Sequence, residues 1–135
     1  MHHQRILIVD DEPQLVELVQ MRLEASGYEV LSAVDGQEGL KKARDEQPDV
    51  IILDLMLPKL NGYEVCTLLK QDARYQHIPI VILTAKTQQK DEALAMDCGA
   101  DAYLRKPFKA EEMLEAIQKF IPGGSTPKEA EPWTR

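Results

Sequence analysis

The side chains in this sequence that are most able to take part in a reaction or bind a ligand stand at the ends of short apolar runs. Asp10 and Asp11 directly follow one such run, and Asp54 ends another. Thr84 ends a third run, and Lys106 follows a fourth. Three carboxylates in one crevice repel one another, so they stay ionised together only when a cation joins them. If the chain brings these five side chains together, they form a site for a metal ion and for an anion.

The residue types predict phosphoryl transfer onto a carboxylate. Ligands that are all oxygen, with positions left for water, suit Mg²⁺ and also Mn²⁺. Lys106 is a compact cation that can hold an anion, and the hydroxyl of Thr84 can hydrogen-bond one. Asp54 is the expected acceptor, because it closes an apolar strand where α/β folds place their ligands. The metal and the lysine would then offset the charge of the transferred group.

The apolar runs also predict the framework that positions these residues. Runs without alternation are typical of strands buried on both faces of a parallel sheet. Apolar residues at helical spacing, with Gly and Pro breaks, predict helices between the strands. Strands are expected near residues 5–9, 28–34, 50–54, 80–84 and 102–105. Helices are expected from Pro13 to the stop at Gly27, around Leu40 and Ala43, and over residues 63–70, 91–97 and 110–121.

The start of the first predicted helix allows a second interpretation of its acidic residues. Pro13 suits a first helical turn, and an acidic residue before it can cap the free N–H groups. An isolated Asp-Asp pair after a strand is more often such a cap than a metal site. Here the side chains of Asp54, Thr84 and Lys106 at the other strand ends favour the metal site over the cap. Within this helix, one stripe is expected to be buried, formed by Leu15, Leu18, Val19 and Leu23.

Five strands that alternate with five helices predict an α/β fold with a doubly wound parallel sheet, because crossovers are short and right-handed. All C-terminal strand ends of such a sheet lie along one edge, so the candidate side chains can converge there. One domain over residues 1–122 accounts for the whole pattern. The polar remainder at residues 123–135 is expected to be a flexible tail or linker.

The composition argues against several classes of protein, including membrane, secreted and nucleic-acid-binding proteins. Of 135 residues, 44% are hydrophobic and 29% charged, which is ordinary for a globular domain. There is no apolar run of membrane-spanning length and no signal-peptide pattern, so a cytoplasmic protein without membrane contact is expected. The net charge of −7 argues against direct nucleic-acid binding by this domain. Cys66 and Cys98 lack the spacing of a zinc site and are expected to be reduced thiols.

Six motifs stand at or near the strand ends: Val9-Asp10-Asp11-Glu12-Pro13, Leu53-Asp54-Leu55-Met56-Leu57-Pro58, Asn61-Gly62, Leu83-Thr84-Ala85, Gly99-Ala100-Asp101 and Tyr103-Leu104-Arg105-Lys106-Pro107-Phe108. Taken together, these motifs resemble the receiver domain of two-component response regulators, which includes the chemotaxis regulators. The resemblance extends over residues 5–121. It implies a flavodoxin-like sheet with the strand order 2-1-3-4-5 and five helices.

The resemblance implies a role for each acidic residue. Asp54 would be phosphorylated by a sensor histidine kinase or by a histidine phosphotransfer protein. Asp11 and Asp54 would bind Mg²⁺ together with the backbone carbonyl of Met56, and Asp10 would ligate the ion through water. Such a domain is a phosphoaccepting switch, and it is not an enzyme beyond assisting its own phosphorylation and dephosphorylation.

The resemblance also implies a switch. Thr84 would hydrogen-bond the phosphoryl group and Lys106, joined to Pro107 by a cis bond, would form an ion pair with it. Tyr103 would then move inward, and the surface of the fourth helix, fifth strand and fifth helix would change. A downstream protein partner or an output domain would recognise the changed surface.

Two other functions share part of this pattern. A phosphohydrolase of the haloacid dehalogenase type uses similar groups, but it needs a DxD motif after the first strand, where this chain has Asp10-Asp11-Glu12. A flavin- or nucleotide-binding module needs a phosphate-cradling loop at the same place, and two aspartates there would repel the ligand.

Overall fold

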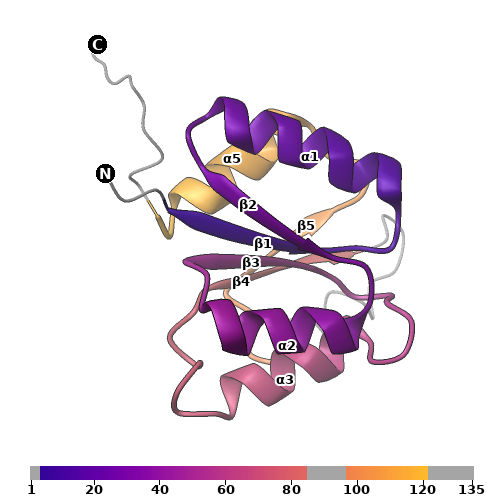
Figure 1. Cartoon of the computed structure of the whole chain (residues 1–135), viewed down its shortest axis with the longest axis vertical. Coiled ribbons are helices and arrows are strands. Elements are labelled where there is room, and N and C mark those ends of the chain that lie inside the picture. Colours follow the sequence, from indigo (N-terminus) through magenta and orange to yellow (C-terminus); the bar gives the residue numbers. More distant parts are fainter. Residues whose placement is uncertain (1–3, 85–96, 122–135) are drawn as a thin grey trace.

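The computed structural model describes residues 4–84 and 97–121 of the chain (Figure 1). The strands are β1 (Arg5–Val9), β2 (Glu29–Ala33), β3 (Val50–Asp54), β4 (Ile80–Thr84) and β5 (Ala102–Arg105). The helices in these ranges are α1 (Pro13–Ala25), α2 (Gly36–Glu46), α3 (Gly62–Lys70) and α5 (Ala110–Gln118).

The five strands form one parallel sheet in the order β2-β1-β3-β4-β5. The central strand is β3, where Ile52 pairs with Ile8 of β1 and with Val81 of β4. Both β3 and β4 are buried along their whole length, because helices cover both faces of the sheet. The predicted doubly wound α/β fold and its strand order are confirmed.

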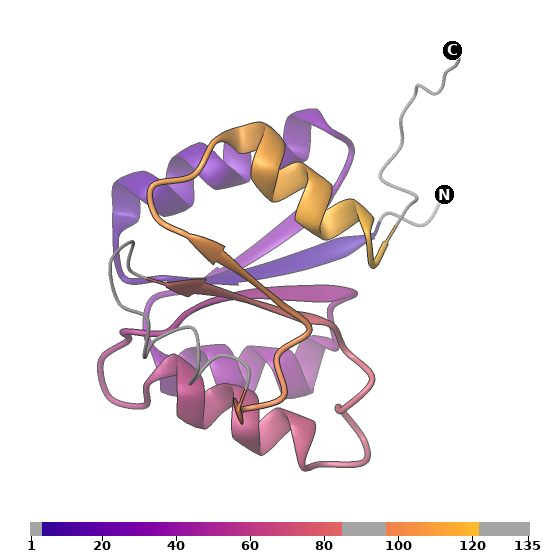
Figure 2. The ribbon, with the colours of Figure 1, turned by 180° about the vertical axis from the view of Figure 1, so that it is seen from behind.

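The helices lie in two layers, with α1 and α5 on one face of the sheet and α2 and α3 on the other (Figures 1 and 2). Alternate strand residues therefore enter different cores, since successive side chains of a strand point to opposite faces. Ile8 packs in the core that includes Leu23 of α1 and Ile117 of α5. Leu7 packs in the other core, which includes Leu69 of α3.

Two helices begin at caps that the local sequence supplies. Asp35 accepts a hydrogen bond of 2.8 Å from the backbone N–H of Glu38 at the start of α2. Asn61 and Glu64 form a reciprocal capping box at the start of α3, with distances of 2.9 and 3.0 Å. At α1, by contrast, the side chain of Glu12 makes no capping hydrogen bond within the described residues, so the alternative of an acidic cap directly before Pro13 is not realised by this residue.

Other predictions about the elements are refined by the structure. The described ranges contain four helices, because the helix predicted at residues 91–97 falls almost entirely outside them. The tail predicted at residues 123–135 also falls outside them and stays a prediction. On α1, Val19 and Leu23 are buried, but Leu18 is 66% exposed, so its predicted burial is wrong. The face of α1 that meets the sheet is narrower than the apolar stripe in its sequence.

No helix in the part of the chain that the structure describes has both the length and the apolar character required to cross a membrane.

Candidate active site

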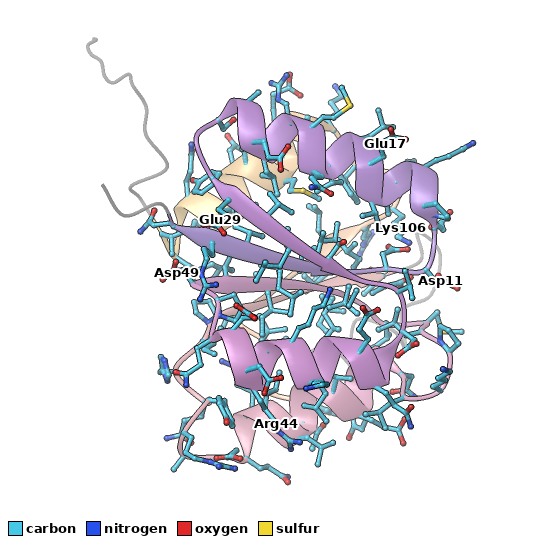
Figure 3. All side chains as sticks on the ribbon, in the orientation of Figure 1. Asp11, Glu17, Glu29, Arg44, Asp49 and Lys106 are labelled. Atoms are coloured by element: carbon cyan, nitrogen blue, oxygen red, sulfur yellow. The ribbon has the colours of Figure 1, made fainter. Side chains whose placement is uncertain are left out.

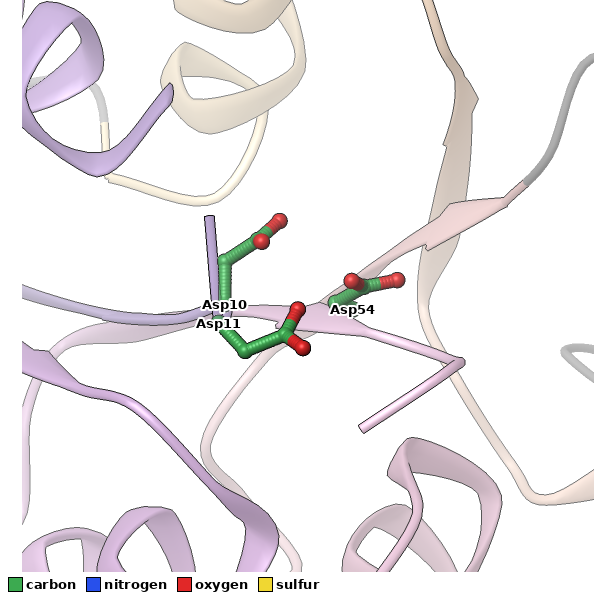
Figure 4. Close-up of side chains that lie close together, drawn as sticks. All are labelled: Asp10, Asp11 and Asp54. Atoms are coloured by element: carbon green, nitrogen blue, oxygen red, sulfur yellow. The ribbon is translucent and has the colours of Figure 1, made fainter. Parts of the chain in front are cut away.

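Three carboxylates converge at the C-terminal edge of the sheet, as predicted. Asp10 and Asp11 follow β1, and Asp54 is the last residue of the neighbouring strand β3 (Figure 4). One oxygen from each of the three side chains lies within 4.8 Å of the other two. Asp10 and Asp54 are buried, whereas Asp11 is exposed, so the cluster opens to solvent on one side.

The backbone holds these side chains in fixed directions. Asp10 Oδ1 accepts a hydrogen bond of 2.9 Å from the backbone N–H of Glu12, and Asp54 Oδ1 accepts one of 3.2 Å from that of Met56. The first residue of α3, Gly62, packs directly behind Asp54. A Cβ at Gly62 would lie only 2.2 Å from the carbonyl oxygen of Asp54, so any larger residue would displace the end of β3.

Lys106, which follows β5, reaches across the edge to the acidic cluster. Its Nζ lies 3.0 Å from Asp10 Oδ2, 3.3 Å from Asp54 Oδ2 and 2.8 Å from Glu12 Oε1. The peptide bond from Lys106 to Pro107 is cis, as the resemblance implies. One ammonium group thus contacts three carboxylates, and it partly offsets their mutual repulsion.

The positive charge near Asp54 does not fully stabilise the ionised form of its carboxyl group. Burial raises the pKa of the Asp54 carboxyl above its ordinary value, and the charge of Asp10 raises it further. Lys106 and the N–H of Met56 oppose this rise without cancelling it. Burial by itself would lower the pKa of Lys106, but its contacts with Glu12, Asp10 and Asp54 outweigh burial and raise it. Lys106 therefore stays charged, and additional positive charge would stabilise the ionised form of Asp54.

Two buried oxygens at this edge lack a hydrogen-bond donor among the described residues, namely Asp10 Oδ2 and Thr84 Oγ1. Asp10 Oδ2 is close to Lys106 Nζ, but the contact does not have the geometry of a hydrogen bond. Leaving a buried polar oxygen unsatisfied is unfavourable, so such atoms commonly have a bound ion or water as partner. The three carboxylates fit a hard divalent cation. Thr84 Oγ1 can hydrogen-bond an added ligand, because it has no partner among the described residues.

The other predicted residues lie around this cluster. Met56 is 68% exposed, two residues beyond Asp54, and its N–H already contacts the Asp54 carboxylate. Tyr103 on β5 is 38% exposed, so the structure has its side chain partly at the surface. Both cysteines are thiols rather than a disulfide, as predicted.

Glu12 contacts the site without having been among its predicted residues. The sequence predicts it as part of the motif after the first strand and as an alternative helix cap, whereas its carboxylate contacts Lys106. The signal available in the sequence was its position directly after Asp10 and Asp11, but no local pattern distinguishes a cap from a partner of a distant lysine.

The fold and the site together define a class of protein: a flavodoxin-like α/β domain with an acidic pocket, a hydroxyl and a lysine at the ends of its parallel strands. The sequence profile of the response regulator receiver domain family matches residues 6–118. The chain belongs to this family. It is therefore a receiver domain, the signalling switch of two-component systems that histidine kinases phosphorylate on an aspartate.

Curated relatives support the same family. The chain is 50% identical over 119 residues to the alkaline phosphatase synthesis transcriptional regulatory protein PhoP of Bacillus subtilis, which covers 88% of this chain and 49% of that protein. It is 49% identical over 117 residues to the DNA-binding dual master transcriptional regulator RpaA of Synechocystis. That match covers 87% of this chain and 48% of the relative. The chain spans about half the length of these relatives.

Solved structures share the fold over most of the chain. Chemotaxis response regulator CheY4 of Vibrio cholerae is 34% identical, with a TM-score of 0.82, and covers 88% of this chain and 99% of that one. The receiver domain of sensor histidine kinase PA1611 from Pseudomonas aeruginosa is 31% identical, with a TM-score of 0.83. The match covers 90% of this chain and 100% of that one. That structure holds a magnesium ion coordinated in its active site cleft.

Proposed function

We propose that Asp54 is the residue of this receiver domain that accepts the phosphoryl group. The observation that carries the proposal is that the Asp54 carboxylate lies close both to two other carboxylates and to the ammonium group of Lys106. Its oxygen lies within 4.8 Å of oxygens of Asp10 and Asp11, and 3.3 Å from Lys106 Nζ. A phosphoryl group on Asp54 would meet a bound cation on one side and the lysine on the other.

The residues proposed to hold Mg²⁺ are Asp11, Asp54 and the backbone carbonyl of Met56, with Asp10 acting through water. Mn²⁺ would suit the same oxygen ligands. The feature that supports this assignment is the convergence of three carboxylates, whose charge the single ammonium group of Lys106 only partly offsets. The ion would supply positive charge that lowers the repulsion between the carboxylates and an incoming phosphoryl group.

The transfer itself is a substitution at phosphorus. An oxygen of the Asp54 carboxylate forms a bond to phosphorus while the bond from phosphorus to the donor breaks, and the donor nitrogen or oxygen keeps the electron pair. Lys106 would exchange part of its contact with Asp54 for an ion pair with the phosphoryl oxygens. Thr84 would donate its hydroxyl hydrogen to the same group, which gives its buried oxygen a polar partner.

The signal would then pass to the surface that contains β5 and α5. Phosphorylation adds about 1.5 to 2 negative charges at one point, which draws Thr84 toward the phosphoryl oxygens. Tyr103 is proposed to turn inward in response, and a protein partner or an output domain would bind the altered face. The curated relatives are transcriptional regulators about twice as long, which supports an output domain as one such reader. The donor would be a sensor histidine kinase or a histidine phosphotransfer protein in the cytoplasm.

The proposal is tested by treating the chain with acetyl phosphate and Mg²⁺ and locating the added phosphoryl group by mass spectrometry. The expected result is one phosphoryl group per chain on Asp54 and none on Asp54→Asn. Asp49→Asn is the matched control, because Asp49 precedes the same strand at its opposite end (Figure 3). That variant is expected to be labelled like the native chain.

Two results would overturn the proposal. One is a phosphoryl group attached to another residue of the native chain. The other is release of phosphate that continues at the native rate in Asp54→Asn, which would favour a phosphohydrolase of the haloacid dehalogenase type.

A further inference from the structure

The only two cysteines of the chain meet in the core beneath α3. Cys66 lies within α3, and Cys98 lies in the turn that leads to β5, 32 residues later. The thiol of Cys66 donates a hydrogen bond to the backbone oxygen of Cys98 at 3.4 Å. Both residues are buried, and both are thiols. None of the roles assigned to the active site uses them.

Neighbouring residues hold the same two segments together. Lys70, one helical turn after Cys66, pairs with Asp101 at 2.8 Å. Gly99 approaches this lysine so closely that a Cβ there would lie 3.3 Å from the Cβ of Lys70, and its φ of +88° favours glycine. Contacts on the C-terminal side of the cysteine pair thus restrict how far α3 and the turn can move apart.

The two thiols are chemically unequal. The interaction between the two side chains raises the pKa of Cys66, whose thiol donates to the backbone oxygen of Cys98, and lowers the pKa of Cys98. Burial raises the pKa of Cys66 further. A thiolate is the form of cysteine that attacks oxidants, so Cys98 is the better nucleophile of the two.

We propose that Cys66 and Cys98 are a redox-sensitive pair that a hydroperoxide converts into an intramolecular disulfide. In the first step the sulfur of Cys98 attacks the peroxide, the O–O bond breaks, and Cys98 becomes a sulfenic acid. In the second step the sulfur of Cys66 attacks the sulfenic sulfur, the S–S bond forms, and water leaves. With hydrogen peroxide, two thiols lose two electrons and two protons, and the peroxide becomes two molecules of water.

The disulfide would join α3 covalently to the turn before β5. Because it closes a loop of the chain, it would restrict the unfolded state and raise resistance to urea. The same strand carries Tyr103 and leads to Lys106, so the bond would tie the redox state of the core to the strand beside the active site.

The test uses the full chain and hydrogen peroxide, without metal or phosphoryl donor, so that its outcome is independent of phosphorylation. After oxidation, the chain is unfolded in N-ethylmaleimide and analysed by peptide mass spectrometry. The expected product is a Cys66–Cys98 linked peptide, lighter by two hydrogen atoms, with no maleimide adduct; dithiothreitol should restore both adducts. Two adducts after oxidation, a disulfide only between two chains, or a sulfinic acid on Cys98 would each overturn the proposal.

Single variants test the order of the steps. In Cys66→Ser the second step is impossible, so the sulfenic acid on Cys98 should persist and react with dimedone. In Cys98→Ser, Cys66 should give little or no dimedone adduct. Equal labelling of the two variants, or labelling of Cys66 alone, would contradict the proposed order, while the linked peptide in the native chain tests the pair itself.

Discussion

The ammonium group of Lys106 lies 2.8 Å from a carboxylate oxygen of Glu12, a residue 94 positions earlier in the chain. The same group contacts Asp10 and Asp54 on its buried side. Lys106 is thereby held at the rim of the acidic pocket, between an exposed carboxylate and two buried ones. It can leave Glu12 at small cost when a phosphoryl group arrives, because the contact with Glu12 is open to solvent.

The first prediction concerns the relative weight of these contacts. Lys106→Met should slow phosphorylation by acetyl phosphate about a hundredfold, since it removes a positioned charge from the transferred group. Glu12→Gln is the matched control and should change the rate by less than about fivefold, because an exposed ion pair contributes about 1 kcal/mol or less. Stopped-flow or quenched labelling gives both rates. Equal effects of the two substitutions would show that Lys106 acts through Glu12.

The second prediction concerns stability and pH. The pKa of Asp54 is raised by burial and by the charge of Asp10. Stability from a group with a raised pKa is fully present below its unfolded value, here 3.8, and is lost as the pH rises through the folded pKa. Asp54→Asn should therefore need more urea to unfold than the native chain at neutral pH without divalent ions. This advantage should shrink as the pH falls toward 3.8. Unfolding followed by circular dichroism in EDTA measures it, and an advantage that grows on acidification would contradict the assignment.

The third prediction concerns metal binding. Mg²⁺ at a hundred times its dissociation constant should stabilise the native chain by about 2.7 kcal/mol. Asp11→Asn removes a proposed ligand and should lose most of this gain. Glu17→Gln makes the same change of charge on the exposed side of α1, away from the carboxylates, and should keep the full gain (Figure 3). Urea unfolding with and without Mg²⁺ compares the three chains. A native response in Asp11→Asn would remove that residue from the ligand set.

The fourth prediction separates phosphorylation from switching. Thr84→Val removes a buried hydroxyl that has no hydrogen-bond partner among the described residues, so the unphosphorylated chain should be as stable or up to about 1 kcal/mol more stable. Asp54 should still be labelled. The amide shifts of Tyr103 and its β5 neighbours in NMR spectra should change much less on phosphorylation than in the native chain. Native-sized changes would show that the switch does not depend on Thr84.

The fifth prediction concerns the lifetime of the phosphorylated state. Met56 is exposed beside Asp54, and its apolar side chain is expected to shield the phosphoryl group from attacking water. Met56→Asn replaces it with a side chain that can hydrogen-bond that water. The half-life of the phosphorylated chain, followed by phosphate release after the donor is removed, should shorten about tenfold or more. An unchanged half-life would exclude shielding by Met56.

Much of the site follows from where the strands end. The apolar runs identify β3 and β4 because strands covered on both faces have apolar residues at nearly every position. The C-terminal ends of parallel strands share one edge, so Asp10, Asp54 and Thr84 were predictable neighbours. The buried extent of α1 was less predictable, because Leu18 has the residue type of a core position but lies on the exposed side of the helix.

By itself, the sequence determined the fold class, the order of the elements and the edge where the acidic residues meet. These depend on burial and backbone sterics, which act over a few residues and leave a visible pattern. Only the tertiary structure decided that Lys106 contacts Glu12 and that Cys66 contacts Cys98. Each of these contacts joins segments that are distant in the chain. Its geometry depends on how helices and strands pack against one another, so it cannot be predicted from the pattern of neighbouring residues.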